Sequence, residues 1–90
     1  MKIKESYLLK EAGDIYVLFP VGQNVVDYKH ILTLNATGYF IVKKLLQETG
    51  YEELLTVMIQ EYEPSEDEMP ILKKDLDDFL QQLRDKDILE

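Results

Sequence analysis

Several residue types on which enzymes depend are absent from this chain or scarce. There is no cysteine, which excludes a disulfide framework, a thiolate zinc site and a thiol nucleophile. Histidine occurs once, at His30, and neither Ser6 nor Ser65 has a base at a spacing that indicates a nucleophile–base pair. The four glycines stand singly, so no phosphate-binding loop is present. The acidic run Glu66–Glu68 lacks the residue order of a calcium loop. The sequence therefore predicts no catalytic residue, no metal site, no cofactor and no enzymatic activity.

Basic residues are also scarce, with ten Lys and Arg against eighteen Asp and Glu and a formal net charge of −8. Nucleic acids and anionic membranes are bound largely through Lys and Arg, so this charge argues against both as partners. It favours a cationic or neutral partner. A simpler interpretation, that the acidic residues keep a small protein soluble, stays open.

Long apolar runs are missing as well. The first nine residues, MKIKESYLL, fit neither a signal peptide nor a membrane anchor, and together with the missing cysteine this fits a cytoplasmic protein. Ninety residues are enough for one domain, spanning residues 1–90, with a modest core.

The first third of the chain has the residue pattern of strands. Short apolar or β-branched runs at Ser6–Leu9, Ile15–Phe19 and Ile31–Leu34 predict three strands, and the letters EAGD between the first two predict a turn. An extension of the third strand back to Val25 stays open. We expect the three strands to form an antiparallel meander.

From Asn35 onward, apolar residues recur with the period of a helix. Asn35 is expected to cap a first helix that closes at Gly50, and Thr49 with Glu52 has the spacing of a capping box for a second helix. The start of a third helix is expected near Pro70. Its apolar stripe consists of Leu72, Leu76, Phe79, Leu80 and Leu83.

This third helix is expected to end at Asp87, where glycine would be easier, and Ile88–Leu89 to fold back as a small apolar tail. Three strands followed by three amphipathic helices predict an α+β domain, a compact helix-turn-helix cluster closed by a small sheet.

The segments YLLKE, DIYVLFPVG, LTLNATGYFIVKKLL, EELL…EY and DLDDFLQQLRDKDILE follow one another in this order. In this combination the chain resembles the pyrroloquinoline quinone biosynthesis protein D (PqqD) family, from Tyr7 to Glu90. The most specific element of the resemblance is Leu34, Asn35, Thr37 and Gly38. The chain departs from the family pattern in having Val42 where Trp is common, Asp87 where Gly is typical, and a longer segment between residues 62 and 75.

The resemblance implies a small winged helix-turn-helix with a three-stranded antiparallel sheet followed by three helices. It also implies a RiPP recognition element, a non-catalytic domain that captures the leader segment of a ribosomally made precursor peptide. The captured leader adds as a strand beside the third strand, lies in a groove against the third helix, and is presented to a modifying enzyme, often of the radical S-adenosylmethionine type.

The letters HILTL suit this role, because the central residues carry no charge and no proline that would block strand pairing. On the helix, Leu72, Leu76 and Phe79 share one face, and Asp75 interrupts this apolar stripe. Asp75 could hold a Lys, an Arg or a backbone amide of the peptide, and Lys73 and Lys74 could flank the groove. The expected peptide-binding residues are His30, Ile31, Leu32, Thr33, Leu72, Lys73, Asp75, Leu76 and Phe79.

Each of these assignments has a plainer alternative. The three apolar helix residues would also suit a core, Asp75 a solvated surface, and the strand could be covered by the protein's own chain. A winged-helix DNA-binding regulator and a structural subunit that docks on an enzyme remain alternative functions, and the edge strand could pair with a second copy in a homodimer. The DNA-binding alternative is disfavoured because the basic residues of the third helix are matched by Asp75, Asp77, Asp78 and Asp85.

Overall fold

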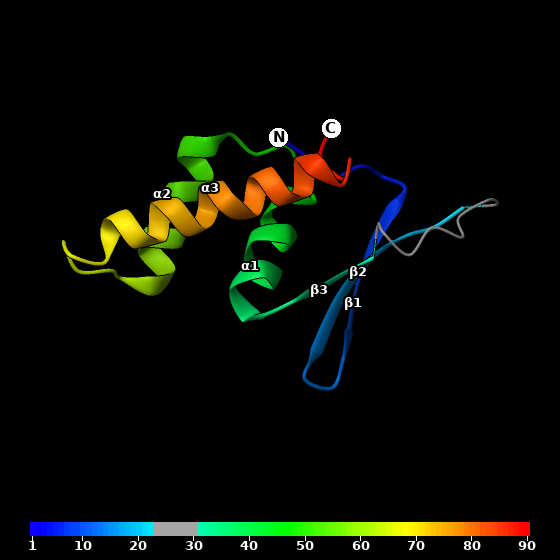
Figure 1. The fold of residues 1–90 in the computed structure, drawn as a ribbon, viewed down its shortest axis with the longest axis horizontal. Coiled ribbons are helices and arrows are strands. Elements are labelled where there is room, and N and C mark those ends of the chain that lie inside the picture. Colours follow the sequence, from blue (N-terminus) through cyan, green and yellow to red (C-terminus); the bar gives the residue numbers. More distant parts are fainter. Residues whose placement is uncertain (23–30) are drawn as a thin grey trace.

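The computed structural model describes residues 1–22 and 31–90, and it confirms the predicted order of three strands followed by three helices (Figure 1). The predicted extension of the third strand to Val25 lies outside the described residues. The elements are β1 (Tyr7–Ala12), β2 (Ile15–Pro20), β3 (Leu32–Leu34), α1 (Ala36–Leu45), α2 (Tyr51–Tyr62) and α3 (Met69–Asp85).

The three strands form the predicted antiparallel meander, in the order β1-β2-β3. Leu18 of β2 lies opposite Leu32 of β3, and both side chains are buried together with Tyr7. Successive side chains of a strand point to opposite faces of the sheet, so Leu8 and Ile15 lie on the outer face, where they are exposed. One face of the sheet therefore covers the core, and the helices lie on that side.

The first strand is longer than predicted, and the turn after it is shorter. β1 continues to Ala12, which pairs with Ile15, so only Gly13 and Asp14 remain for the turn. Gly13 has φ 62°, in the left-handed region that favours glycine at a tight hairpin turn. The letters EAGD indicated the turn, but its first two residues are compatible with an exposed edge strand.

The predicted cap of α1 is confirmed. The side-chain oxygen of Asn35 accepts a hydrogen bond of 2.8 Å from the backbone N–H of Gly38. This bond satisfies one of the free amides in the first turn of the helix. Asn35 is thus the single residue between the end of β3 at Leu34 and the start of α1 at Ala36.

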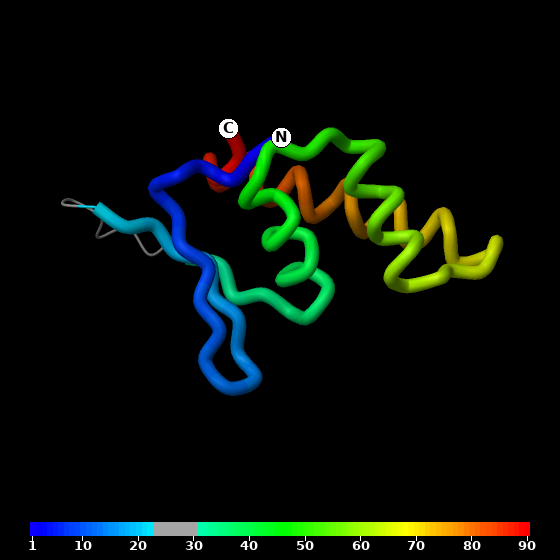
Figure 2. The backbone as a smooth tube through the Cα atoms, turned by 180° about the vertical axis from the view of Figure 1, so that it is seen from behind, coloured from blue at the N-terminus to red at the C-terminus, as the bar shows by residue number. Residues whose placement is uncertain are grey.

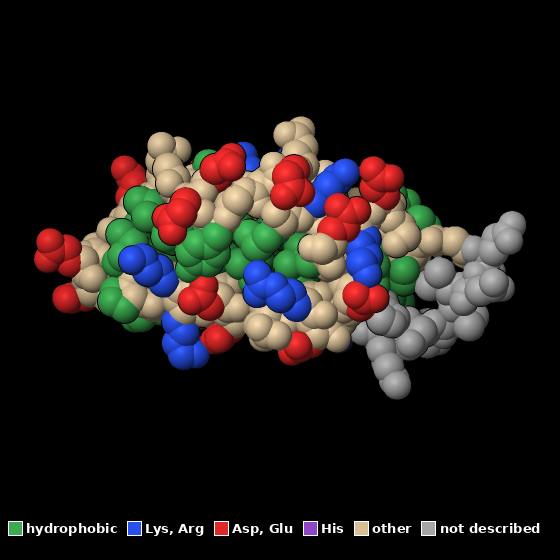
Figure 3. Space-filling model, turned by 90° about the horizontal axis from the view of Figure 1, so that it is seen from above, with side chains coloured by type: hydrophobic (Ala, Val, Ile, Leu, Met, Phe, Trp, Pro, Cys, Tyr) green, Lys and Arg blue, Asp and Glu red, His purple; other side chains and the backbone are tan. Residues whose placement is uncertain are grey.

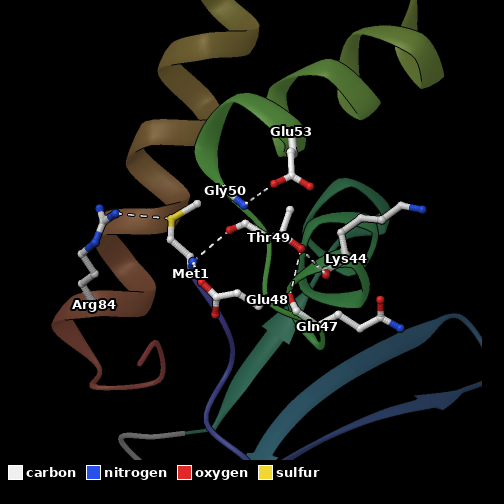
Figure 4. A network of polar contacts seen from close by, with 8 residues as sticks. All are labelled: Met1, Lys44, Gln47, Glu48, Thr49, Gly50, Glu53 and Arg84. Carbon is white, nitrogen blue, oxygen red and sulfur yellow. Dashed lines mark hydrogen bonds and ion pairs between the residues drawn. The ribbon is translucent and has the colours of Figure 1, made fainter.

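The predicted junction between the first two helices is wrong in detail. α1 ends at Leu45, and Gly50 is the N-cap of α2 instead of the end of α1. Glu53, not Glu52, accepts from the Gly50 N–H at 3.4 Å. The hydroxyl of Thr49 donates to the carbonyl oxygens of Lys44 and Gln47 (Figure 4), so it satisfies the end of α1 and does not cap α2.

The third helix begins at Met69, with Pro70 in its first turn as predicted, and ends two residues before Asp87. Asp87 has φ 59°, the left-handed conformation that the sequence indicated, and Ile88 beyond it is fully buried. Leu89 then forms a bridge with Ile3, which places the two termini side by side (Figures 1 and 2).

The core lies between the inner face of the sheet and the three helices. Each helix contributes apolar side chains that are almost completely buried: Ile41, Val42, Leu45, Leu54, Met58, Leu76, Leu80 and Leu83. Val42 has no exposed surface. Most of the stability must come from burying this cluster, because burial of apolar surface is the dominant favourable contribution to folding.

Charged side chains lie on the surface, and among the described residues none is buried. On the face seen from above, hydrophobic side chains form a band flanked by charged side chains of both signs (Figure 3). None of the described helices combines the length and the apolar content that a membrane span requires.

Candidate functional site: the edge of β3 and the adjoining groove

The strand β3 lies at one edge of the sheet. It pairs with β2, with Val17 opposite Thr33, and no strand in residues 1–22 or 31–90 pairs with its other side. In an antiparallel strand, alternate residues direct their N–H and C=O groups away from the neighbouring strand. None of the three residues of β3 is charged or proline, the features with which proteins usually block an edge. This edge is therefore suited to pairing with an added strand.

A groove of about 640 Å³ begins where β3 ends. Three helices form it: the first turns of α1, the end of α2 and the loop after it, and the first four turns of α3. The lining residues are Asn35, Thr37, Gly38, Ile41, Met58, Tyr62, Pro64, Glu68, Ile71, Leu72, Asp75, Leu76, Asp78, Phe79 and Gln82.

Gly38 is the point at which the strand, α1 and α3 meet. A Cβ atom at this position would lie 3.4 Å from Cδ2 of Leu34, 3.4 Å from Cε1 of Phe79 and 3.3 Å from Oδ1 of Asn35. A larger residue would press against the end of β3 and against α3 together. The Leu-Asn-x-Thr-Gly element thus has two physical roles, the helix cap at Asn35 and a close approach of α1 to α3 at Gly38.

The floor of the groove is apolar, and part of its rim is apolar too. Ile41, Met58 and Leu76 are almost completely buried and form the floor. Ile71 and Tyr62 on the rim have 61% and 40% of their surface exposed. Large apolar side chains with this much exposure gain stability when a partner covers them, so the groove is suited to apolar side chains of a ligand.

Three carboxylates line the groove, and two of them have partners within the chain. Glu68 accepts hydrogen bonds from Ser65, chiefly from its backbone N–H, and these bonds lower the pKa of Glu68. Asp78 accepts a hydrogen bond of 2.7 Å from Lys74, and this bond raises the pKa of Lys74. Asp75, by contrast, forms no hydrogen bond or ion pair with any described residue, and its negative charge makes a small contribution to the raised pKa of the neighbouring Lys74. In the described part of the chain, no three His, Cys, Asp or Glu side chains lie close enough together to hold a metal ion.

The structure brings four of the five expected helix residues into the groove: Leu72, Asp75, Leu76 and Phe79. Lys73, the fifth, is exposed and does not line the groove, and neither does Lys74, which pairs with Asp78 instead.

The four expected strand residues lie at the edge or outside the described part of the chain. The side chain of Leu32 is buried, so this residue can present only backbone, whereas Thr33 is exposed. Ile31 precedes β3, which is one residue shorter than predicted, and it has 40% of its surface exposed. His30 lies outside the residues that the structure describes.

The sequence did not point to several lining residues. Ile71, Asp78 and Gln82 of α3 could have been found, because they continue the helix row of Asp75 in steps of four and three residues. Met58 and Tyr62 on α2 could not, because periodicity within one helix does not say which neighbouring helix it meets. Their position depends on how α2 packs beside α3.

The chain has no significant match among curated protein sequences. A solved structure described as "TbiB1 in Complex with the TbiA(beta) Leader Peptide" has 28% sequence identity to the chain and a TM-score of 0.75, over 100% of this chain and 95% of that one. Residues 9–89 match the family described as "Coenzyme PQQ synthesis protein D (PqqD)". This match spans nearly the whole domain, and the chain therefore belongs to the PqqD family.

Proposed function

We propose that this protein is a RiPP recognition element, which binds the leader segment of a ribosomally synthesised precursor peptide by strand addition to β3. The observation that carries the proposal is the junction of an uncovered strand edge with an apolar groove against α3. TbiB1, which matches the chain over its full length, has been solved with a leader peptide, and this supports the proposal.

Both the strand β3 and the groove would contribute to the free energy of peptide binding. β3 has three residues, so only a few of its backbone groups point outward, and each hydrogen bond contributes about 0.5–1.5 kcal/mol net. A dissociation constant of about 1 µM requires about 8 kcal/mol. Strand pairing with β3 alone falls short of that value, so we assign most of the affinity to apolar side chains in the groove and the register of the peptide to the strand.

In this proposal the protein binds the peptide and catalyses no reaction itself. It holds the leader while a modifying enzyme, of the radical S-adenosylmethionine type, acts on the rest of the precursor in the cytoplasm. Support comes from membership of the family and from a groove that is mainly apolar. An interface with a short peptide buries about 1,600 Å² or less, so we expect an affinity between tens of nanomolar and tens of micromolar, which permits release.

Isothermal titration calorimetry with the leader segment of the precursor encoded beside the gene tests the proposal. We expect saturable one-to-one binding in this affinity range, and a scrambled leader of the same composition is the control. Equal heats for the leader and the scrambled peptide, or none for either, would contradict the proposal. Light scattering in the same samples shows whether the edge pairs with a second copy instead, because a homodimer would dissociate as the leader binds.

A further inference from the structure

The groove carries negative charge without any compensating basic residue in its lining. Glu68, Asp75 and Asp78 line it, and no Lys or Arg from residues 1–22 or 31–90 does. Two of these carboxylates are engaged, Glu68 with Ser65 and Asp78 with Lys74. Asp75 forms no such bond: its charge interacts with Lys74 at longer range, but the Lys74 ammonium is bonded to Asp78, so the Asp75 carboxylate can still accept a hydrogen bond from a ligand.

Asp75 stands among apolar side chains of the same helix face. Leu72 precedes it by three residues and Phe79 follows it by four, and both line the groove with it. A peptide that covers Leu72 and Phe79 must also remove water from around the carboxylate of Asp75. Removing water from a charge that has no partner is unfavourable, whereas a charged hydrogen bond to the ligand offsets that loss.

From this arrangement, and resting on the proposed function, we propose that Asp75 is a specificity-determining residue that selects leader peptides carrying a Lys or Arg next to their apolar anchor residues. The aliphatic stem of such a side chain packs over Leu72, and its cationic head reaches Asp75. The selection acts against other peptides as much as in favour of these, because a neutral or acidic residue at that position leaves Asp75 without a partner. The partner is thus a peptide with apolar anchor residues and a Lys or Arg beside them.

A display selection tests this without knowledge of the natural leader. A library of random twelve-residue peptides is selected on the immobilised full-length protein, on Asp75→Asn and on Glu61→Gln. The last variant removes the same charge from an exposed residue of α2 that does not line the groove. Circular dichroism establishes that all three fold alike, as expected for substitutions of exposed side chains.

For the unchanged protein and for Glu61→Gln, we expect enriched peptides to share apolar residues with a Lys or Arg at a fixed distance from them. For Asp75→Asn the apolar residues should persist and the basic preference should disappear. A selected peptide should then bind Asp75→Asn roughly tenfold more weakly than the unchanged protein, whereas its Lys→Gln version should bind Asp75→Asn at least as tightly as the unchanged protein, because the variant has no charge to desolvate. Raising the salt concentration should reduce the difference between the two proteins.

Three results would overturn the inference, and they differ in what they say of the proposed function. Enriched apolar peptides without a basic preference would refute the selectivity and leave peptide capture standing. A basic preference that survives in Asp75→Asn would refute the role of Asp75. If no peptide is enriched on any of the three proteins, and the natural leader also fails to bind, peptide capture fails and the inference with it.

Discussion

Replacing Leu72 by serine is expected to weaken leader binding roughly five- to tenfold while the protein stays folded. Leu72 lines the groove and is half-buried in the free protein, so a bound peptide can cover what remains exposed. Burying a fully exposed leucine contributes about 1.5–3 kcal/mol, so the exposed part of Leu72 contributes about 1 kcal/mol or less, and the serine hydroxyl adds the cost of burying a polar group without a partner. Calorimetric titration of the variant with the same leader measures the loss directly.

Leu46→Ser is the matched control for this prediction. Leu46 is also a partly exposed leucine, with 42% of its surface accessible, but it lies at the end of α1 and does not line the groove. We expect its dissociation constant to stay within about twofold of the unchanged protein. Equal weakening in both variants would show that binding follows general surface hydrophobicity and not the groove.

Replacing Leu80 by alanine is expected to lower the free energy of unfolding by about 2–5 kcal/mol. Leu80 is 1% exposed and lies on the apolar stripe of α3 within the core. Truncation removes buried methyl groups and leaves a cavity that the surrounding side chains fill only in part. Domains of this size have stabilities of about 5–15 kcal/mol, so the loss is a large fraction of the total.

Urea denaturation followed by circular dichroism measures this loss, and Gln81→Ala is its control on the same helix. Gln81 is exposed, and its side-chain amide donates a hydrogen bond to Asp85 one turn later. We expect the control to change the free energy of unfolding by about 0.5 kcal/mol or less. A similarly small change for Leu80→Ala would mean that α3 does not pack on the core as described.

Much of the fold follows from short-range patterns in the sequence. Asn35 marked the start of α1 because its side chain can cap only residues that follow it closely. Pro70 indicated where α3 begins, because proline fixes its own backbone angle φ. Asp87 indicated where the chain turns after α3, because this residue adopts the left-handed conformation. The same locality explains why Leu72, Asp75, Leu76 and Phe79 were assigned to one helix face before their surroundings were known.

Features that depend on competing local partners or on packing were not predictable in this way. Thr49 could cap α2 or satisfy the end of α1, and in the structure its hydroxyl bonds to the carbonyl oxygens of Lys44 and Gln47. The contribution of Met58 and Tyr62 to the groove depends on the placement of α2 beside α3. Lys73 shares a helix with the groove residues, but it is exposed and does not line the groove that α1 and α2 complete.

In the proposed complex, the strand β3 and the groove contribute differently to leader recognition. A short strand fixes the direction and register of the peptide through its backbone, irrespective of sequence. On the proposal made above, the apolar floor, Asp75 and the rim distinguish one leader from another. Sequence changes within the groove should therefore alter which leader is bound while leaving the manner of binding unchanged.

Nuclear magnetic resonance of the protein with its leader tests the strand addition most directly. The account predicts cross-strand nuclear Overhauser effects between the peptide backbone and Leu32–Leu34, together with slower hydrogen exchange at the outward-facing amides of β3 once the peptide is bound. If the peptide binds and β3 shows neither cross-strand effects nor slower exchange, the peptide does not extend the sheet and the central claim is wrong.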